Sequence, residues 1–196
     1  MKLYYSSASP YARKVRVVAL EKNISLELVA VSVADNPPEL HRENPVGKIP
    51  TLITEKGVAL PESSHICVYL DAIKPTPAVF PKGDGLANVL RRDALAIGMM
   101  DALVRHVLES RRPAETQSRV WIDRQIAAIN RTLDVLEKEI DGISPALSID
   151  QISLMVALDY ADFRLPQLKW KEKYARLAAW VAAFGQRQSI KETMPC

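Results

Sequence analysis

The chain has 196 residues, enough to bury a hydrophobic core as one large domain or as two small ones. Apolar residues make up 48% and charged residues 25%, which is typical of an ordinary globular protein and not of a disordered or membrane-embedded chain. The net charge is only +3 and the basic residues are interleaved with acidic ones, so we expect neither nucleic acid nor an anionic membrane as a partner.

The start of the chain does not resemble a signal peptide, because Pro10, Arg13 and Lys14 follow after only a short apolar stretch. No apolar run elsewhere reaches the length of a transmembrane helix. The two cysteines, Cys67 and Cys196, form neither a CxxC motif nor a metal-ligand cluster, and Cys67 stands in an apolar run typical of a core. We therefore expect a cytoplasmic protein without a bound metal.

The first half of the chain alternates strand signals with helix signals. The predicted elements are, in order, a strand at 2–5, a helix at 10–23, a strand at 26–31, a short helix at 39–42, strands at 51–54 and 58–60, and a helix that begins at 62–64. The opening β-α-β unit requires a parallel strand pair with a right-handed crossover. The whole order is that of an α/β thioredoxin-like domain with a mixed four-stranded sheet.

The second half predicts helices only. Prolines and glycines in residues 74–77 and 81–85 mark a linker, since neither a helix nor a strand continues through them. Beyond it, isoleucines and leucines between Ile122 and Ile140 recur at steps of three and four, the stripe of a long amphipathic helix. Further helices are predicted near 87–110, 148–161 and 174–187. We expect a thioredoxin-like domain at residues 1–75, a linker at 76–85 and an all-α helical bundle domain at 86–196.

Three short motifs carry a family resemblance. They are SPYARKVRV at residues 9–17, NPVGKIPTL at 44–52 and PESSHICVYL at 61–70. In this order and spacing they resemble the successive signatures of the soluble glutathione transferase family, particularly of its bacterial members. The helical half, with MMDALVRHVLESRRP at 99–113 and SIDQISLMVALDYADFRLP at 148–166, extends the resemblance over nearly the whole chain.

Ser9 is the candidate for activating the thiol of glutathione. A serine followed by Pro10 is a strong helix-start pair, so the Ser9 hydroxyl is expected beside the positive end of a helix, where a thiolate is favoured. The resemblance implies that this hydroxyl hydrogen-bonds the glutathione sulfur. Ser9 as a helix cap alone is the structural alternative, and Tyr5, Ser6 and Ser7 are alternative thiol-activating residues.

The resemblance also implies how the rest of the tripeptide is held. A cis bond before Pro50 would turn the N–H and C=O of Ile49 outward, where they pair with the cysteinyl backbone of glutathione like an added strand. Lys48 would offer a cation to the glycine carboxylate. The alternatives are a proline that only shapes a loop and a lysine that is simply solvated.

The third motif would hold the γ-glutamyl end, which carries both charges. The resemblance assigns the α-ammonium group to Glu62 and the α-carboxylate to Ser63, at a helix start whose free N–H groups suit an anion. Ser63 as a helix cap beside a solvated Glu62 is compatible with this role, and Ser64 is the substitute for Ser63.

In the helical half, the resemblance places Met99, Leu103 and His106 on a helix that walls the pocket for the second substrate, although core packing is the usual place of such residues. Ser148 and Gln151 fit the capping box S-x-x-Q. The family usually has an acid where Gln151 stands, and we expect folding to survive this difference.

The implied function is enzymatic: a glutathione thiolate stabilised by Ser9 attacks an electrophilic carbon of an apolar substrate. Dehalogenases, ether-cleaving enzymes, isomerases and peroxidases of this family are all compatible with the motifs. The alternative is a non-catalytic glutathione-binding or interaction protein with the same fold. A thiol-disulfide exchanger is disfavoured because Ser9 stands where its cysteine would be. Family members usually form twofold dimers, so the resemblance implies a homodimer.

Overall fold

A computed structural model describes residues 1–196 and shows two compact units. The first consists of residues 1–81 together with 187–196, and the second of residues 82–186. The second unit is all-helical, as predicted for this half of the chain, but the stretch from 187 onward packs with the first unit and not with the expected helical domain. None of the helices is long and apolar enough to cross a membrane.

The first unit contains β1 (Lys2–Tyr5), α1 (Pro10–Glu21), β2 (Glu27–Ala30), α2 (Pro38–Glu43), β3 (Thr51–Ile53), β4 (Ala59–Pro61), α3 (Ser63–Ile73) and α9 (Gln188–Glu192). The second contains α4 (Leu86–Ser110), α5 (Arg119–Glu139), α6 (Ile149–Arg164), α7 (Trp170–Lys173) and α8 (Ala175–Phe184).

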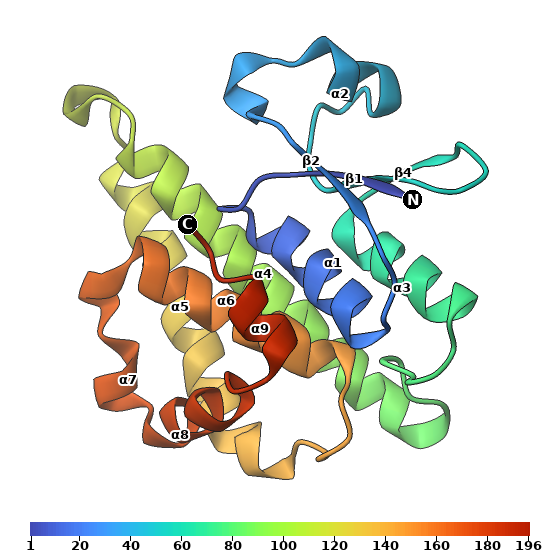
Figure 1. The fold of residues 1–196 in the computed structure, drawn as a ribbon. Coiled ribbons are helices and arrows are strands. Elements are labelled where there is room, and N and C mark those ends of the chain that lie inside the picture. Colours follow the sequence, from blue (N-terminus) through green and yellow to red (C-terminus); the bar gives the residue numbers. More distant parts are fainter. The chain divides into compact units, whose positions relative to one another are not determined.

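The four strands form one mixed sheet in the order β2-β1-β3-β4. β1 and β2 are parallel, whereas β1 with β3 and β3 with β4 are antiparallel. Helices α1 and α3 lie on one face of this sheet and α2 on the other (Figure 1). The predicted thioredoxin-like arrangement with a mixed four-stranded sheet is therefore confirmed.

The core of the first unit lies between the sheet and helices α1 and α3. Leu3 and Leu52 from the strands are fully buried, as are Val15 from α1 and Leu70 from α3. Burial of each such side chain stabilises the fold by about 2 kcal/mol. Because α1 packs on α3 and both underlie the sheet, the residues at their N-terminal ends are held in fixed positions.

Helix α9 belongs to the first unit because it docks on α1. The buried guanidinium group of Arg13 donates to the hydroxyl of Thr193 at 3.3 Å and to the carbonyl of Ile190 at 3.2 Å. Arg187 forms two hydrogen bonds with the carboxylate of Glu21, of 2.8 and 2.7 Å. A charged side chain is buried at little cost only where such partners exist, so α1 requires the C-terminal segment for its own packing.

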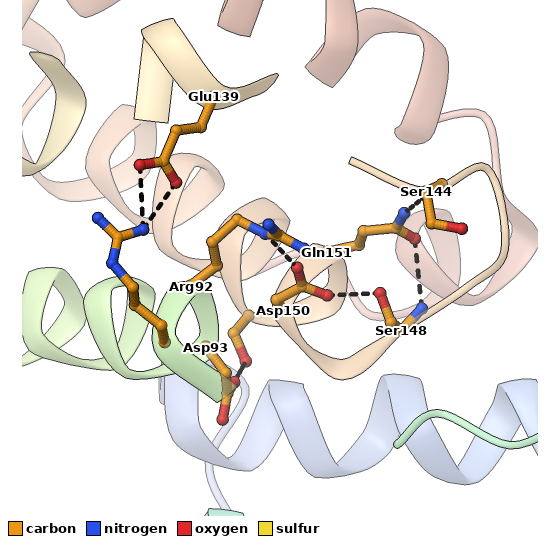
Figure 2. Close-up of polar contacts among 9 residues, drawn as sticks. Arg92, Asp93, Glu139, Ser144, Ser148, Asp150 and Gln151 are labelled. Carbon is orange, nitrogen blue, oxygen red and sulfur yellow. Dashed lines mark hydrogen bonds and ion pairs between the residues drawn. The ribbon is translucent and has the colours of Figure 1, made fainter. Parts of the chain in front are cut away.

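The second unit is built around α4 and α6. Every residue of α6 from Ile149 to Ala161 is buried, and α4 packs against both α5 and α6. The Arg92 guanidinium meets the buried Asp150 carboxylate at 2.6 Å, and the Ser148 hydroxyl donates to the same carboxylate (Figure 2). The Ser148 N–H donates to Gln151 Oε1 at 3.3 Å, as the capping box requires. The predicted start of α6 is therefore present with glutamine in place of the usual acid.

Candidate functional site

The strand register brings the three motifs to one end of the sheet. Thr51, the first residue of β3, pairs with Tyr4 of β1 on one side and with Pro61 of β4 on the other. At this end the chain leaves β1, enters β3 and leaves β4, because β3 runs antiparallel to both neighbours. The turn before α1, the loop before β3 and the start of α3 therefore meet there.

Ser9 is the N-cap residue of α1. Its Oγ accepts a hydrogen bond from the N–H of Ala12 at 3.3 Å, and Pro10 is the first helical residue. The oxygen serves as the acceptor in this bond, so the hydroxyl hydrogen is left to donate elsewhere. The side chain stands at the positive end of a 12-residue helix, where a negative charge is stabilised.

The alternative residues lie close by in the chain but are placed differently. The Ser7 hydroxyl donates to the carbonyl of Cys196 at 3.1 Å, which turns it toward the C-terminal segment of the same unit. The Tyr5 ring is covered by the guanidinium of Arg16, whose central carbon is 5.1 Å from the ring centroid. The Ser6 carbonyl accepts from the Ser9 N–H at 3.1 Å and so closes the turn that presents Ser9.

The loop before β3 ends in a cis peptide bond between Ile49 and Pro50. The backbone N–H and C=O of Ile49 form no hydrogen bond within the protein. Backbone groups without a partner at the end of a sheet can accept an added peptide strand. Lys48 is exposed and its side chain forms no ion pair, so its ammonium group is open to solvent.

Asn44 shapes this loop, a role that the motif alone did not reveal. The Asn44 side chain is buried and its amide donates to the Lys48 carbonyl at 2.9 Å and to the Thr51 hydroxyl at 3.0 Å. Its Oδ1 accepts from the N–H of Val46 at 3.1 Å. The signal was present in the sequence, since asparagine before proline commonly closes a turn with its side chain.

Glu62, and not Ser63, is the N-cap residue of α3. The Glu62 carboxylate accepts from the Ser64 N–H at 3.1 Å to each oxygen, from the His65 N–H at 3.3 Å and from the Ser63 hydroxyl at 3.1 Å. Its backbone has a φ of 74°, a conformation that costs a residue with a side chain about 1–3 kcal/mol. Partial burial raises the pKa of Glu62, but these hydrogen bonds outweigh it and hold the pKa below its ordinary value.

The start of α3 thus already holds an anion, which is the carboxylate of Glu62. Ser63 is 1% exposed, and its single hydroxyl hydrogen is engaged by Glu62. The Ser63 hydroxyl can donate to a ligand only after Glu62 releases it. The Glu62 carboxylate is half-exposed, and the Nδ1 of His65 lies 2.9 Å from its Oε2.

The three residues expected around a second substrate all lie on α4. Met99 and Leu103 are 1% and 0% exposed and belong to the buried face of the helix. His106 is buried too, and it lines a cavity of about 280 Å³ within the second unit. Burial and then the charge of Arg119 lower the pKa of His106, so its imidazole is neutral at pH 7. No group of three or more metal-ligating side chains gathers anywhere in the chain.

Comparison with known families matches both halves of the chain. Residues 3–78 match the family model described as the glutathione S-transferase N-terminal domain, and residues 119–183 match the one described as the C-terminal domain. Both matches fall on the elements described above. The motifs around Ser9, Pro50 and Glu62 lie inside the first of them.

Individual relatives are similar to this chain over its full length. The chain is 34% identical to the uncharacterized GST-like protein YibF of Escherichia coli K12 over 100% of its own length and 98% of that protein. A crystal structure of a glutathione S-transferase from Methylobacillus flagellatus KT with glutathione bound is 38% identical, with a TM-score of 0.94 over 100% of this chain and 99% of that one. A family member from Pseudomonas fluorescens Pf-5 with bound S-(propanoic acid)-glutathione is 37% identical, with a TM-score of 0.90 over the full length of both. The protein thus belongs to the glutathione S-transferase family.

Proposed function

We propose that this protein is a glutathione transferase in which Ser9 stabilises the thiolate of bound glutathione. The observation that carries the proposal is the convergence of Ser9, the Ile49 backbone and Glu62 at one end of the sheet, which follows from the strand register. The relatives from Methylobacillus flagellatus and Pseudomonas fluorescens bind glutathione or an S-substituted glutathione. Both are similar to this chain in sequence and in fold over its full length, which supports glutathione as the ligand here.

Two groups lower the pKa of the glutathione thiol: the N-terminus of α1 and the hydroxyl of Ser9. The N-terminus of α1 contributes a positive potential, and the hydroxyl hydrogen, which is not needed for capping, donates to the sulfur. The thiolate then attacks an electrophilic carbon; the carbon–sulfur bond forms as the leaving group departs with its electron pair, or as an activated double bond takes up a proton. Positioning of both reactants supplies the rest of the rate.

The tripeptide is read along the same end of the sheet. The cysteinyl backbone pairs with the N–H and C=O of Ile49, which have no partner in the protein. The α-ammonium group of the γ-glutamyl residue pairs with the Glu62 carboxylate, whose lowered pKa keeps it ionised. As Glu62 turns toward this cation, Ser63 and the start of α3 become free for the α-carboxylate. Lys48 reaches the glycine carboxylate.

The helical unit supplies the second-substrate site through Met99, Leu103 and His106 of α4. Met99 and Leu103 are buried within the packing of α4, and His106 is the residue of the three that lines a cavity. A cytoplasmic homodimer is the form proposed for the working protein. The Pseudomonas fluorescens relative holds a glutathione whose sulfur carries a short acidic substituent, which supports thioether formation as the reaction class.

The test measures glutathione binding by calorimetry and the conjugation of 1-chloro-2,4-dinitrobenzene for the wild type and for Ser9→Ala. We expect Ser9→Ala to retain glutathione binding and to lose about 100-fold in kcat, as when one donor to a developing anion is removed. Ser118→Ala is the matched control, because Ser118 caps α5 by accepting from the Trp121 N–H at 3.3 Å. It makes the same substitution and removes the same kind of cap.

Each result has a definite reading. An unchanged rate for Ser9→Ala moves the role to Tyr5, Ser6 or Ser7. Absence of glutathione binding by the wild type rejects the ligand. Tight binding with no turnover of any electrophile makes the protein a non-catalytic member of the family.

A further inference from the structure

The start of α3 is covered by a carboxylate of the protein itself. The side chain of Glu62 folds back over the helix, and its oxygens accept from the N–H groups of Ser64 at 3.1 Å and His65 at 3.3 Å. A further contact comes from a side chain, because the Nδ1 of His65 lies 2.9 Å from Oε2 of the same carboxylate. Residues three apart on a helix lie on one face, which is why the two side chains meet.

The histidine is the donor in this side-chain contact. An ionised carboxylate can only accept, so the hydrogen of the bond sits on Nδ1 of His65. The side chains of His65 and Glu62 are 75% and 50% exposed, and contacts between side chains as exposed as these are weak. The contact therefore does not lock Glu62 in place. It shifts an equilibrium between a Glu62 that covers the start of α3 and a Glu62 that has turned away.

A Glu62 that covers the start of α3 competes with the ligand. In the proposed function the α-carboxylate of the γ-glutamyl residue needs the N–H groups and the Ser63 hydroxyl that Glu62 engages. Two carboxylates cannot share these donors, because like charges repel. When only a fraction of the molecules has a vacant site, the apparent Kd rises in inverse proportion to that fraction. Each contact that keeps Glu62 in place thus weakens glutathione binding.

We propose that His65 is a positioning residue for glutathione binding: its ring holds the Glu62 carboxylate over the start of α3 and so lowers the affinity for the γ-glutamyl end. The inference rests on the proposed function and deepens it. The His65 side chain forms no other hydrogen bond or ion pair, so its replacement changes this contact and leaves Glu62 and Ser63 intact. Glutathione conjugates carry the same γ-glutamyl end, and the contact lowers their affinity as well.

Calorimetry with two ligands tests this: glutathione, and 4-aminobutyryl-cysteinylglycine, which lacks only the α-carboxylate. We expect His65→Ala to bind glutathione about threefold more tightly than the wild type, the effect of losing one exposed pair. Its affinity for the analogue should be unchanged, because the analogue leaves the start of α3 unused. His65→Asn keeps a side-chain N–H donor and should restore the wild-type affinity. Val68→Ala is the matched control, since Val68 is exposed on α3 three residues further along.

A second readout needs no ligand and separates this inference from the proposed function. Hydrogen exchange at the Ser64 amide, which donates to Glu62, should be about threefold faster in His65→Ala and unchanged in His65→Asn and Val68→Ala.

Three results would reject the positioning role of His65. They are an unchanged glutathione affinity in His65→Ala, a weaker one, and an equal gain for the analogue that lacks the α-carboxylate. If exchange at Ser64 quickens as expected but the wild type binds no glutathione, the hold of His65 on Glu62 is supported and the proposed function fails.

Discussion

The ammonium group of Lys22 lies 2.5 Å from the carboxylate of Asp71, and the lysine is completely buried. It also donates to the carbonyls of Lys74 at 2.9 Å and Pro77 at 2.6 Å. Lys22 follows the last residue of α1, and its partners lie at and beyond the end of α3. One side chain therefore ties together the two helices beneath the sheet.

Replacing Lys22 by methionine should destabilise the protein by about 3 kcal/mol. The substitution keeps the apolar stem but leaves the Asp71 carboxylate and two carbonyls without their cation. Denaturant unfolding measures the change. Lys2→Met is the control, because the Lys2 ammonium is 3.9 Å from Glu27 in an exposed pair and should contribute below about 1 kcal/mol. Equal effects of the two substitutions would show that burial of the Lys22 pair is energetically unimportant.

Replacing Asp150 by asparagine should destabilise the helical unit by about 3 kcal/mol. The carboxylate is fully buried between Arg92 and the Ser148 hydroxyl, and its loss leaves the Arg92 guanidinium without a counter-charge (Figure 2). Thermal and urea unfolding measure this. Asp123→Asn changes an exposed pair with Arg119 at 3.0 Å and should have little effect. A loss for Asp150→Asn that is no larger than this control would contradict the prediction.

Replacing Glu62 by glutamine should weaken glutathione binding about tenfold, because the α-ammonium group loses its carboxylate partner. The neutral amide still offers an oxygen to the start of α3, so the fold should persist. Calorimetry at pH 7 gives the affinity, and Glu55→Gln in the exposed β3–β4 turn is the control. Unaltered affinity in Glu62→Gln would remove Glu62 from the binding site.

Replacing Glu21 by glutamine should alter the pH dependence of unfolding. Partial burial raises the pKa of Glu21, but the hydrogen bonds from Arg187 and Ser189 and the charge of Arg187 lower it by more. A lowered folded-state pKa stabilises the protein above the unfolded-state value, about 4.3. This stabilisation is lost as the pH falls through the folded-state pKa. We expect Glu21→Gln to lose about 1 kcal/mol at pH 7 and almost nothing near pH 2.

Urea unfolding at pH 7 and near pH 2 measures whether the loss of stability in Glu21→Gln is larger at the higher pH. Glu27→Gln is the control, since Glu27 is exposed on β2 and its ion pair with Lys2 is long. A difference between the wild type and Glu21→Gln that grows toward low pH would contradict the assignment of the bond to Arg187.

Local signals predicted most of the fold. Helix α1 begins at a serine–proline pair, the hairpin turns at Gly57 with a φ of 76°, and the apolar stripe of α5 repeats over several turns. Each of these is a property of a few neighbouring residues. Helices α7 and α9 were not predicted as separate elements, because they span only Trp170–Lys173 and Gln188–Glu192 and so show no period.

Long-range contacts escaped prediction. A lysine after a helix is normally solvated, and Lys22 is buried only because oxygens from residues 71, 74 and 77 surround it. The place of residues 187–196 depends on Arg13 and Glu21, far away in the sequence.

In the candidate site, too, some features were predictable from the sequence and others were not. Ser9 as a cap followed from its neighbour Pro10, and the cis bond before Pro50 is as the family resemblance implied. That Glu62 would fill the start of α3 was not predictable, because it depends on a positive φ that sequence patterns rarely predict for glutamate.

Docking of α9 on α1 makes the sheet-bearing unit discontinuous in sequence. During synthesis its first 81 residues emerge long before Thr193 does, and until then the Arg13 guanidinium has no Thr193 hydroxyl or Ile190 carbonyl to meet it. The whole helical unit is thus an insertion between two pieces of one folding unit. A fragment that stops at residue 81 is an incomplete version of that unit, and a deletion of residues 187–196 acts at the far end of the chain on the helix that Ser9 caps.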